Sequence, residues 1–534
     1  MNKKKIYLIL IFILSSFLLI GCNKTKKTKE VITVNEVYVD ASEASTFSVS
    51  KVFSDSMVLQ RNERIRIFGF APETENGKKV TADFMMMHSE AIIENGEWEI
   101  VFPHGVKESL DNNELTIKAS DTVITFKDIL VGDCFMVVGQ SNVAYSMANY
   151  FQSSNKENIK IDDNAPIRIN YNSLSQDPGL YVRGSSECLK EPNSIDYLGW
   201  EKATFENIQK FSAYGYLFAY HFINLTDSKV PVGLIEIDGN GQPLGSFLPN
   251  EVAEKTNSDT LDDWGEYYIP DGLNARYARY LYNEFMYPFE RYPISGLIWY
   301  QGESDLPYDS MIEYEKRFTQ LITYMRSTHH LYKKDFNVYM TEFPTIFDKP
   351  IGYSGVDQWQ YLDTGNIRGV VSSIPYRLIN NSYLVVSSDL WSDNTYWNNL
   401  HPNCKYDQAL RLAKIVSSVN ENKYTLDEVL PPMVKTIKYN KDSTKVTITF
   451  DFVGEGLKLS DNGKIVKGFL GLSREFNPDI EVEAKIVNKN TIEIVSTTPL
   501  SGIAYNTIST NQFNKDINVC DSYNNPLGAF LINK

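Results

Sequence analysis

The sequence predicts an α/β domain with a parallel sheet, flanked on both sides by all-β regions. Residues 46–130 and 431–534 consist of short runs that alternate apolar and polar residues between turn residues, which is typical of antiparallel strands. Residues 131–425 instead alternate continuous apolar runs with helical patterns, which predicts a parallel sheet with helices on both faces. A chain of 534 residues is also too long for one compact core, so several domains are expected.

The first 45 residues are expected to form a leader and a tether outside this fold. Three lysines at positions 3–5 precede an apolar stretch, 6–20, that is too short for a comfortable membrane span. Leu-Ile-Gly-Cys at 19–22 resembles the box at which bacterial lipoprotein signals are cleaved before a cysteine that receives lipid. We therefore expect a signal peptide at 1–22, a lipid on Cys22 and a solvated tether at 23–45. The alternative is a plain signal peptide or an anchor helix.

The β regions and the central domain each supply several expected elements. In the β regions the alternating pattern predicts strands at 64–68, 79–84, 122–126 and 445–450. In the central domain continuous apolar runs predict strands at 129–138, 231–237, 294–300, 336–340 and 383–387. Helical patterns are found at 211–224 and 314–329, and a helix is expected to open at about Val143.

Charge and cysteine content exclude several classes of partner and site. The formal net charge is −15, which argues against nucleic acid and anionic lipid surfaces, so a membrane is expected to be met only through the lipid anchor. The cysteines beyond the leader, Cys134, Cys188, Cys404 and Cys520, are far apart and form no Cys/His cluster, so no zinc site is expected. They are either buried thiols or members of disulfides that the sequence does not assign.

Polar residues follow several of the expected strands of the central domain. Ser141 stands where the apolar run 129–138 passes into a helix, and the first turn of a helix offers unpaired amides to an anion. Asp-Gly-Asn-Gly-Gln at 238–242 follows a second strand, and Gln-Gly-Glu-Ser-Asp at 301–305 follows a third. His401 stands in the last α/β segment. Ligands of open α/β sheets bind at these strand ends, which makes the four segments candidates for one site.

Several other polar residues have simpler structural interpretations. A lone serine after a strand is usually a turn or N-cap residue. His221 lies in an aromatic helix and is expected to pack in the core, whereas His329 and His330 suit the C-terminal end of a helix. Glu303 and Asp305 could imitate the carboxylate pair of a glycosidase, but we expect them to brace Gln301 and a neighbouring cation. Asp133 is expected to be a turn or bracing residue.

The four segments together resemble one known family. Gly-Gln-Ser-Asn at 139–142, Trp-Tyr-Gln-Gly-Glu-Ser at 299–304 and His401-Pro402, with Lys405 and Arg-Leu-Ala at 411–413, are similar to the sialate O-acetylesterase family of the SGNH hydrolase superfamily. Flanking residues at 57–61, 130–133 and 211–213 share the resemblance, which extends in the same order over nearly the whole chain beyond the tether. It implies an SGNH-like three-layer catalytic domain at 131–425, an O-acetylated glycan as substrate, and no metal or organic cofactor.

The resemblance also implies a role for each site residue. Ser141 would attack the acetyl carbonyl, and His401 would accept its proton and return it to the departing sugar hydroxyl. The oxyanion would receive hydrogen bonds from the amides of Ser141 and Gly241 and from the side chain of Gln301. The family typically has two glycines where this chain has Asn240 and Gly241, so the choice between these two amides stays open.

The acid of the expected triad is the main departure from the family. It is usually an aspartate three residues before the histidine, and this chain has Asn398 there. Asp393 could reach in from the preceding loop, Asn398 could orient the imidazole without a charge, or the site could work as a serine–histidine dyad. We favour Asp393 slightly, because triad acids commonly come from loops.

Three functions are compatible with these residues. The leading one is a sialate O-acetylesterase acting on 9-O-acetyl sialic acids, anchored by lipid at a bacterial cell surface or in the periplasm. The second is an esterase for acetylated xylan or another glycan. The third is a carbohydrate-binding lipoprotein without turnover. A sialate carboxylate calls for an arginine in the pocket, and Arg183, Arg276 and Arg377 are the candidates by residue type.

Overall fold

One strand, β8 (Thr122–Gly139), connects the first β region with the central sheet. Its burial pattern changes along its 18 residues: Thr122–Asp128 are exposed or half-buried, whereas Ile129–Gly139 are all buried. The first part pairs antiparallel with β7 (Ser109–Ala119), and the second part pairs in parallel with β11 (Val232–Asp238) and β12 (Gly296–Tyr300). The expected division at 130/131 therefore falls inside a strand that the two regions share.

The computed structural model describes residues 44–153, 157, 159–173, 199–256, 281–305, 308–328, 335–343, 359–390, 401–507 and 515–534. Within these ranges, no helix is both long enough and apolar enough to span a bilayer. The leader with Cys22 lies outside the described residues, as do Cys188, Arg183, Arg276, His329 and His330.

The central sheet has the strand order β10-β9-β11-β8-β12-β13-β14. The strands from β9 to β14 are parallel to their neighbours, and β10 is antiparallel to β9. The bounds of the strands not yet given are Ile167–Ser173 for β9, Trp200–Lys202 for β10, Asn337–Thr341 for β13 and Ser382–Val385 for β14. The mixed α/β fold predicted from the alternation of apolar strands and helices is confirmed, and all five predicted strands of this domain are present.

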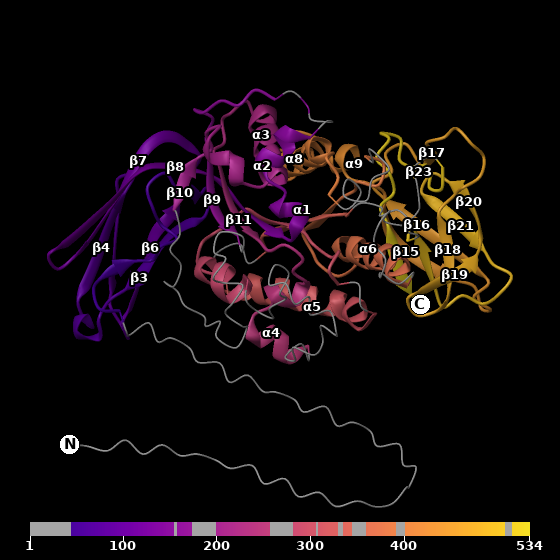
Figure 1. Cartoon of the computed structure of the whole chain (residues 1–534), viewed down its shortest axis with the longest axis horizontal. Helices are drawn as coiled ribbons and strands as arrows, with labels where there is room; N and C mark the ends of the chain where they lie inside the picture. The colour runs from indigo at the N-terminus through magenta and orange to yellow at the C-terminus, as the bar shows by residue number, and fades with distance from the viewer. Residues whose placement is uncertain are drawn as a thin grey trace, which may run out of the picture. The chain divides into compact units, whose positions relative to one another are not determined.

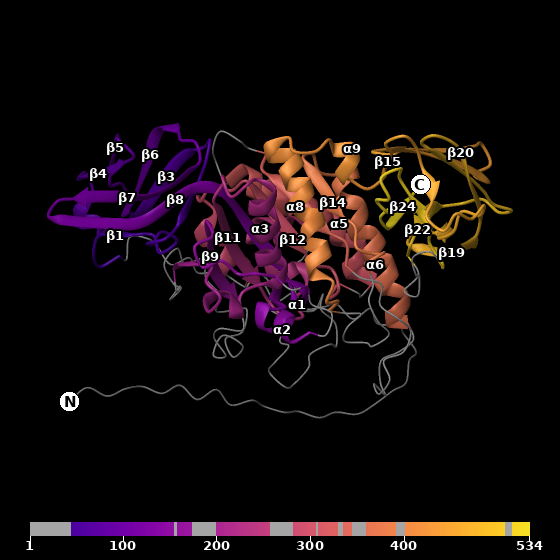
Figure 2. The same ribbon diagram turned by 90° about the horizontal axis from the view of Figure 1, so that it is seen from above.

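Helices cover both faces of this sheet. In Figures 1 and 2, α3 (Ala213–Leu225) and α8 (Lys405–Glu421) lie side by side on one face. On the other face lie α4 (Asn250–Lys255), α5 (Tyr308–Thr328) and α6 (Trp359–Arg377). The helices predicted at 211–224 and 314–329 correspond to α3 and α5. The short helices are α1 (Ser141–Ala144), α2 (Met147–Gln152) and α9 (Leu426–Val429).

The two flanking regions are built of antiparallel strands, as their alternating sequences predict. The first contains β1 (Ser48–Val49), β3 (Arg64–Phe70) and β6 (Glu97–Gly105) in one sheet, and β4 (Lys79–Phe84) and β5 (Met87–Ile92) beside β7. Its remaining strand, β2 (Val58–Gln60), pairs in parallel with β8.

The C-terminal region forms three small sheets. The first has the order β15 (Met433–Tyr439), β16 (Lys445–Asp451), β21 (Thr491–Val495) and β20 (Glu483–Asn488). The second has the order β19 (Asn477–Glu481), β18 (Phe469–Arg474), β22 (Gly502–Tyr505) and β24 (Phe530–Asn533). The third pairs β17 (Lys458–Leu459) with β23 (Val519–Cys520).

Buried charges connect the flanking regions to the central sheet. Asp133 on β8 is 2% exposed and accepts hydrogen bonds from Arg61 Nε at 2.8 Å and Arg61 Nη2 at 2.9 Å, and from Asn420 Nδ2 at 2.9 Å. Its predicted bracing role is therefore confirmed. Removing one partner of such a buried pair typically costs roughly 3–5 kcal/mol.

A second buried carboxylate, Glu342 at the end of β13, performs the same task on the C-terminal side. Its oxygens accept hydrogen bonds from the amide of Ala529 at 2.8 Å and from the amides of Ser387 at 3.0 Å and Ser388 at 3.2 Å. Burial raises the pKa of Glu342, while the positive charge of Arg368 on α6 opposes the rise. The Arg368 guanidinium in turn donates from Nε to the carbonyl oxygen of Asn506 at 3.2 Å.

Candidate active site

Three of the predicted site segments leave the sheet at neighbouring strand ends. In the strand register, Gly139 at the end of β8 is the partner of Asp238 on β11 on one side and of Tyr300 on β12 on the other. The loops at 140–142, 239–242 and 301–305 therefore begin side by side. The Gly239 amide also donates to the Gly139 carbonyl oxygen at 3.2 Å, which holds two of these loops together.

Position 139, two residues before Ser141, has no room for a side chain and therefore requires glycine. A Cβ atom on Gly139 would lie 2.1 Å from the carbonyl oxygen of Tyr300 and 2.7 Å from Cγ2 of Val143. Because the first of these is a backbone atom, it cannot move aside cheaply. This close approach lets the chain turn directly from β8 into α1, whose first residue is Ser141. The predicted strand-to-helix position of the serine is confirmed.

Ser141 remains partly exposed between buried neighbours. Gln140 and Asn142 on either side of it are 3% and 0% exposed. Asn240 and Gly241 are likewise partly exposed at the tip of their loop, and so is His401, whereas Gln242 is buried. Gly241 has a φ of +66°, a left-handed conformation that a glycine adopts without strain. The serine, this loop tip and the histidine are thus the parts of the predicted site that reagents can reach.

Gln301 is held in place by a fully bonded side chain. It is 0% exposed, and its Nε2 donates to Asp305 Oδ2 at 2.6 Å, with Gln242 O at 3.3 Å and Gln140 Oε1 at 3.4 Å also within reach. Its Oε1 accepts from the Tyr314 hydroxyl at 2.8 Å. The expectation that Asp305 braces Gln301 is confirmed. That Gln301 donates a hydrogen bond to an oxyanion stays a prediction. To do so, its Nε2 would have to give up one of these hydrogen bonds.

A buried bridge joins the serine segment to the histidine segment. Lys405 Nζ donates to Asn142 Oδ1 at 2.6 Å, and Asn142 Nδ2 donates to Glu303 Oε1 at 2.5 Å. The lysine ammonium also lies 4.8 Å from the centre of the Tyr300 ring. Asn142 is adjacent to Ser141, and Lys405 follows His401 by four residues. This bridge therefore brings the two segments of the expected nucleophile and base together.

Burial shifts the pKa values of the two ionisable side chains in this bridge. It raises the pKa of Glu303 to about 7, although the hydrogen bonds that this carboxylate accepts favour its charged form. Burial also lowers the pKa of Lys405 to about 8, and the nearby Glu303 carboxylate counteracts that shift. Glu303 was expected to brace a neighbouring cation, and the structure links it to Lys405 through Asn142. The part played by Asn142 was missed, since an asparagine after a serine reads as a turn residue.

His401 is a neutral imidazole at neutral pH. Burial and the positive charge of Lys405 lower its pKa to about 4. At neutral pH it therefore lacks the second proton, which is the form that a general base requires. Asp389, in the segment before the histidine, is bonded to Arg411 of α8 at 2.7 and 2.6 Å through its two oxygens. The two candidates for the triad acid, Asp393 and Asn398, lie outside the described residues.

Two further predictions concern residues away from these loops. The suggestion that Arg377 binds a sialate carboxylate is wrong. Arg377 donates to Glu315 Oε1 at 2.8 Å and ends α6 just before β14 begins, at the opposite edge of the sheet from Ser141. His221 is 6% exposed and packs edge-on against Tyr406 with 4.4 Å between ring centres, so its predicted core position is confirmed.

Replacing Lys405 tests how the bridge sets the charge state of the histidine. In Lys405→Met the cation that lowers the pKa of His401 is lost, so we expect the acid limb of the kcat/KM–pH profile to move to higher pH. Loss of the buried hydrogen bond from Lys405 to Asn142 should also destabilise the fold by roughly 1–3 kcal/mol. Profiles for a chromogenic acetyl ester, read together with thermal melts, check both effects. An unmoved acid limb in a folded variant would contradict this electrostatic coupling.

Comparisons with known proteins show which family the central part of the chain matches. Residues 131–343 match the model of the family described as carbohydrate esterase, sialic acid-specific acetylesterase. The chain is 22% identical to human sialate O-acetylesterase over 424 residues, which cover 76% of this chain and 77% of that protein. It is also 22% identical to the rat sialate O-acetylesterase over 376 residues, with 63% of this chain and 65% of the rat protein covered.

A solved structure shares the fold over almost the full length. It is the crystal structure of XAC1771, a carbohydrate acetylesterase from Xanthomonas citri, with a TM-score of 0.67, 19% identity, and 92% of this chain and 100% of that chain covered. At this identity the likeness speaks for the fold. Together with the family match, these findings show that residues 131–343 form a domain of the sialic acid-specific carbohydrate esterase family, the family that the chain's motifs resemble.

Proposed function

We propose that this protein is a serine carboxylic ester hydrolase that removes O-acetyl groups from sialic acids. The observation that carries the proposal is the Lys405–Asn142 hydrogen bond of 2.6 Å, because it brings the histidine segment to the serine segment at the strand ends. The family of residues 131–343 supplies the reaction class. In this assignment residues 131–425 are an SGNH-like catalytic domain of three layers, which the flanking β regions border.

The proposed reaction begins at the exposed serine. Ser141 Oγ attacks the acetyl carbonyl carbon while the neutral imidazole of His401 accepts the hydroxyl proton. The tetrahedral intermediate collapses by breaking the bond to the sugar oxygen, which takes the proton back from His401. Water, deprotonated by the same imidazole, then attacks the acetyl-serine ester and releases acetate. No cofactor is needed at any step.

The oxyanion of the tetrahedral intermediate is assigned to the three adjoining loops. The donors are the amide of Ser141, the amide of Gly241 or Asn240 and the carboxamide of Gln301. Gly241 and Asn240 are favoured by their exposed position at the loop tip. Loss of one well-placed donor typically raises the barrier by about 3 kcal/mol, so these amides carry much of the proposed rate enhancement.

Asp393 is the proposed orienting acid of His401. Asp389, the nearest described carboxylate before the histidine, is bonded to Arg411 and is therefore not available. A carboxylate stabilises the imidazolium that forms during attack, whereas the amide of Asn398 can only fix the tautomer. Asn398 is the alternative that the variants below distinguish.

The proposed location is the outer face of a bacterial membrane or the periplasm, with a lipid on Cys22. The support is the sequence of the leader alone. The mass of the N-terminal peptide of the mature protein tests this anchor: a diacylglyceryl cysteine supports it, and an unmodified N-terminus contradicts it.

Acetate release from a chromogenic acetyl ester tests the catalytic assignment. We expect Ser141→Ala to lose at least on the order of 10⁴ in kcat, and Asp393→Asn to lose a comparable factor. The matched control is Ser327→Ala, an exposed serine of α5, which should keep the wild-type rate. Equal rates for wild type and Ser141→Ala would end the proposal. A loss in Asn398→Ala with full activity in Asp393→Asn would transfer the orienting role to the amide.

The substrate is tested separately. Wild-type enzyme is assayed side by side on mucin carrying 9-O-acetyl sialic acid and on acetylated xylan, with Ser141→Ala as the blank. The proposal predicts a higher kcat/KM on the sialoside. Preferential release of acetate from xylan would keep the serine chemistry and reject the sialate assignment, and tight binding without release from either would favour a binding lipoprotein.

A further inference from the structure

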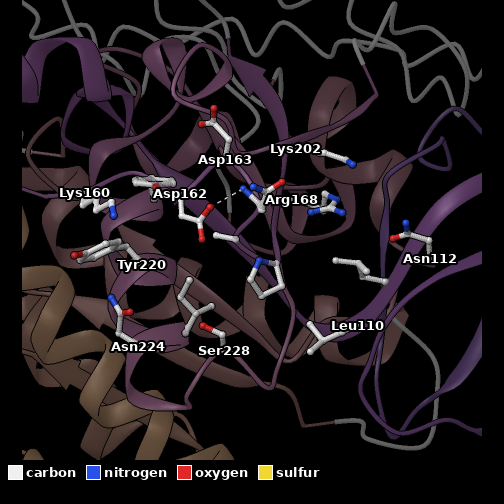
Figure 3. Close-up of a pocket in the computed structure, with 16 residues that line it drawn as sticks. Leu110, Asn112, Lys160, Asp162, Asp163, Arg168, Lys202, Tyr220, Asn224 and Ser228 are labelled. Carbon is white, nitrogen blue, oxygen red and sulfur yellow. Dashed lines mark hydrogen bonds between the residues drawn. The ribbon is translucent and has the colours of Figure 1, made fainter.

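A cavity of about 700 Å³ lies at the edge of the central sheet opposite to Ser141 (Figure 3). It reaches Leu130, near the start of the buried part of β8, and Arg168 at the start of β9. Leu130 precedes Gly139 by nine residues, which at ~3.3 Å per residue puts the cavity about 30 Å from the serine along β8. It is therefore a separate site from the one described above.

Two walls of this cavity face each other. Figure 3 shows Tyr220 and Asn224, from the last turns of α3, on one side, and Leu110 and Asn112 on the opposite side. The register between β7 and β8 shifts between Ser109 and Asn113, so residues 110–112 leave the ladder as a bulge. The bulge presents Leu110, a large apolar side chain that is 52% exposed, at the rim of the cavity.

The lining contains polar side chains that have no hydrogen-bond partner among the described residues. Tyr216 is 1% exposed, and among the described residues no group is hydrogen-bonded to its hydroxyl. Within the same ranges the side chains of Lys160 and Asn224 have no hydrogen-bond partner either. The Tyr216 hydroxyl is not one of the fully buried polar atoms without a partner, so the small exposed part of this side chain includes the hydroxyl and opens into the cavity. There it can form a hydrogen bond with solvent or with a ligand.

The charges around the cavity balance. Arg168 Nη2 lies 3.4 Å and Lys202 Nζ 3.1 Å from the same carboxylate oxygen of Asp128. Asp128, which is not itself part of the lining, pairs with both Arg168 and Lys202. Of the lining charges only Lys160, Asp162 and Asp163 remain, so the cavity has no excess of positive charge to recognise a phosphate or a sialate. Amide, carboxylate and hydroxyl groups beside tyrosine rings instead supply mixed donors, acceptors and flat apolar faces, which suit a polyhydroxylated and uncharged ligand.

We propose that this cavity binds an uncharged oligosaccharide segment and serves as a second glycan-binding site, remote from the ester-cleaving one. Its volume lies in the range of sites that enclose a ligand of several rings. It would hold the polymer that carries the acetylated sugar and so raise the local concentration of substrate at Ser141. Binding at this cavity does not require ester hydrolysis, so it can be tested independently of catalytic turnover.

Calorimetric titration of the mature protein with probes that carry no O-acetyl group tests this site. The neutral probes are lacto-N-tetraose, a segment of the kind of glycan that carries sialic acid, and the hexasaccharides of β-1,4-linked xylose, glucose and mannose; sialyllactose is the anionic comparison. We expect at least one neutral probe to bind saturably. Asn224→Trp should weaken that binding by at least tenfold by filling the cavity, and Tyr216→Phe by roughly threefold to tenfold by removing one hydroxyl.

The matched control is Lys229→Trp, an exposed position outside the lining, which should bind like wild type. All three variants should hydrolyse a small chromogenic acetyl ester at the wild-type rate, which separates this site from Ser141. Tyr216→Phe removes a single oxygen, so it remains informative if the tryptophan variant fails to fold. The proposal would be overturned if no neutral probe bound, if Asn224→Trp and Tyr216→Phe bound like wild type, or if only sialyllactose bound and Asn224→Trp abolished that binding.

Discussion

The close contact between Gly139 and the Tyr300 carbonyl is the constraint on which the site depends. A Cβ at that position would approach the oxygen to 2.1 Å, so β8 and β12 can end side by side only because residue 139 is glycine. The same residue is in register with Asp238 on β11. Three loops with different chemistry therefore leave the sheet at one place, and the first of them carries Ser141.

Buried polar bonds then hold these loops in place. Gln301 is held by Asp305 and Tyr314, while Asn142 connects Lys405 with Glu303. Such networks are costly when only partly satisfied, because an unpaired buried group loses its hydration without compensation. The side chains beneath the site are thus locked, whereas Ser141 and the loop tip at Asn240 and Gly241 stay accessible. Rigid support under an exposed nucleophile is what a preorganised site requires.

Much of this arrangement could be predicted from the sequence, because the strands of the central sheet are continuous apolar runs. The strand β9 escaped prediction because its buried positions include Arg168, Asn170 and Asn172, which give it a polar appearance. Helix α6 escaped because it contains Gly369 and Pro375. Gly369 is explained by packing: a Cβ there would lie 2.7 Å from Thr507 Cγ2 and 3.0 Å from the carbonyl carbon of Phe530. Arg377 was a candidate by residue type alone, and only the fold reveals its pairing with Glu315.

The central claim is that Ser141 is a nucleophile activated by His401. Labelling with a fluorophosphonate, followed by mass spectrometry of the peptides, tests it most directly, because the reagent forms a stable adduct only with an activated serine. The account predicts one adduct per chain, on the peptide that contains Ser141, and its loss in His401→Ala. An adduct on a different serine, or undiminished labelling of Ser141 without the histidine, would contradict it.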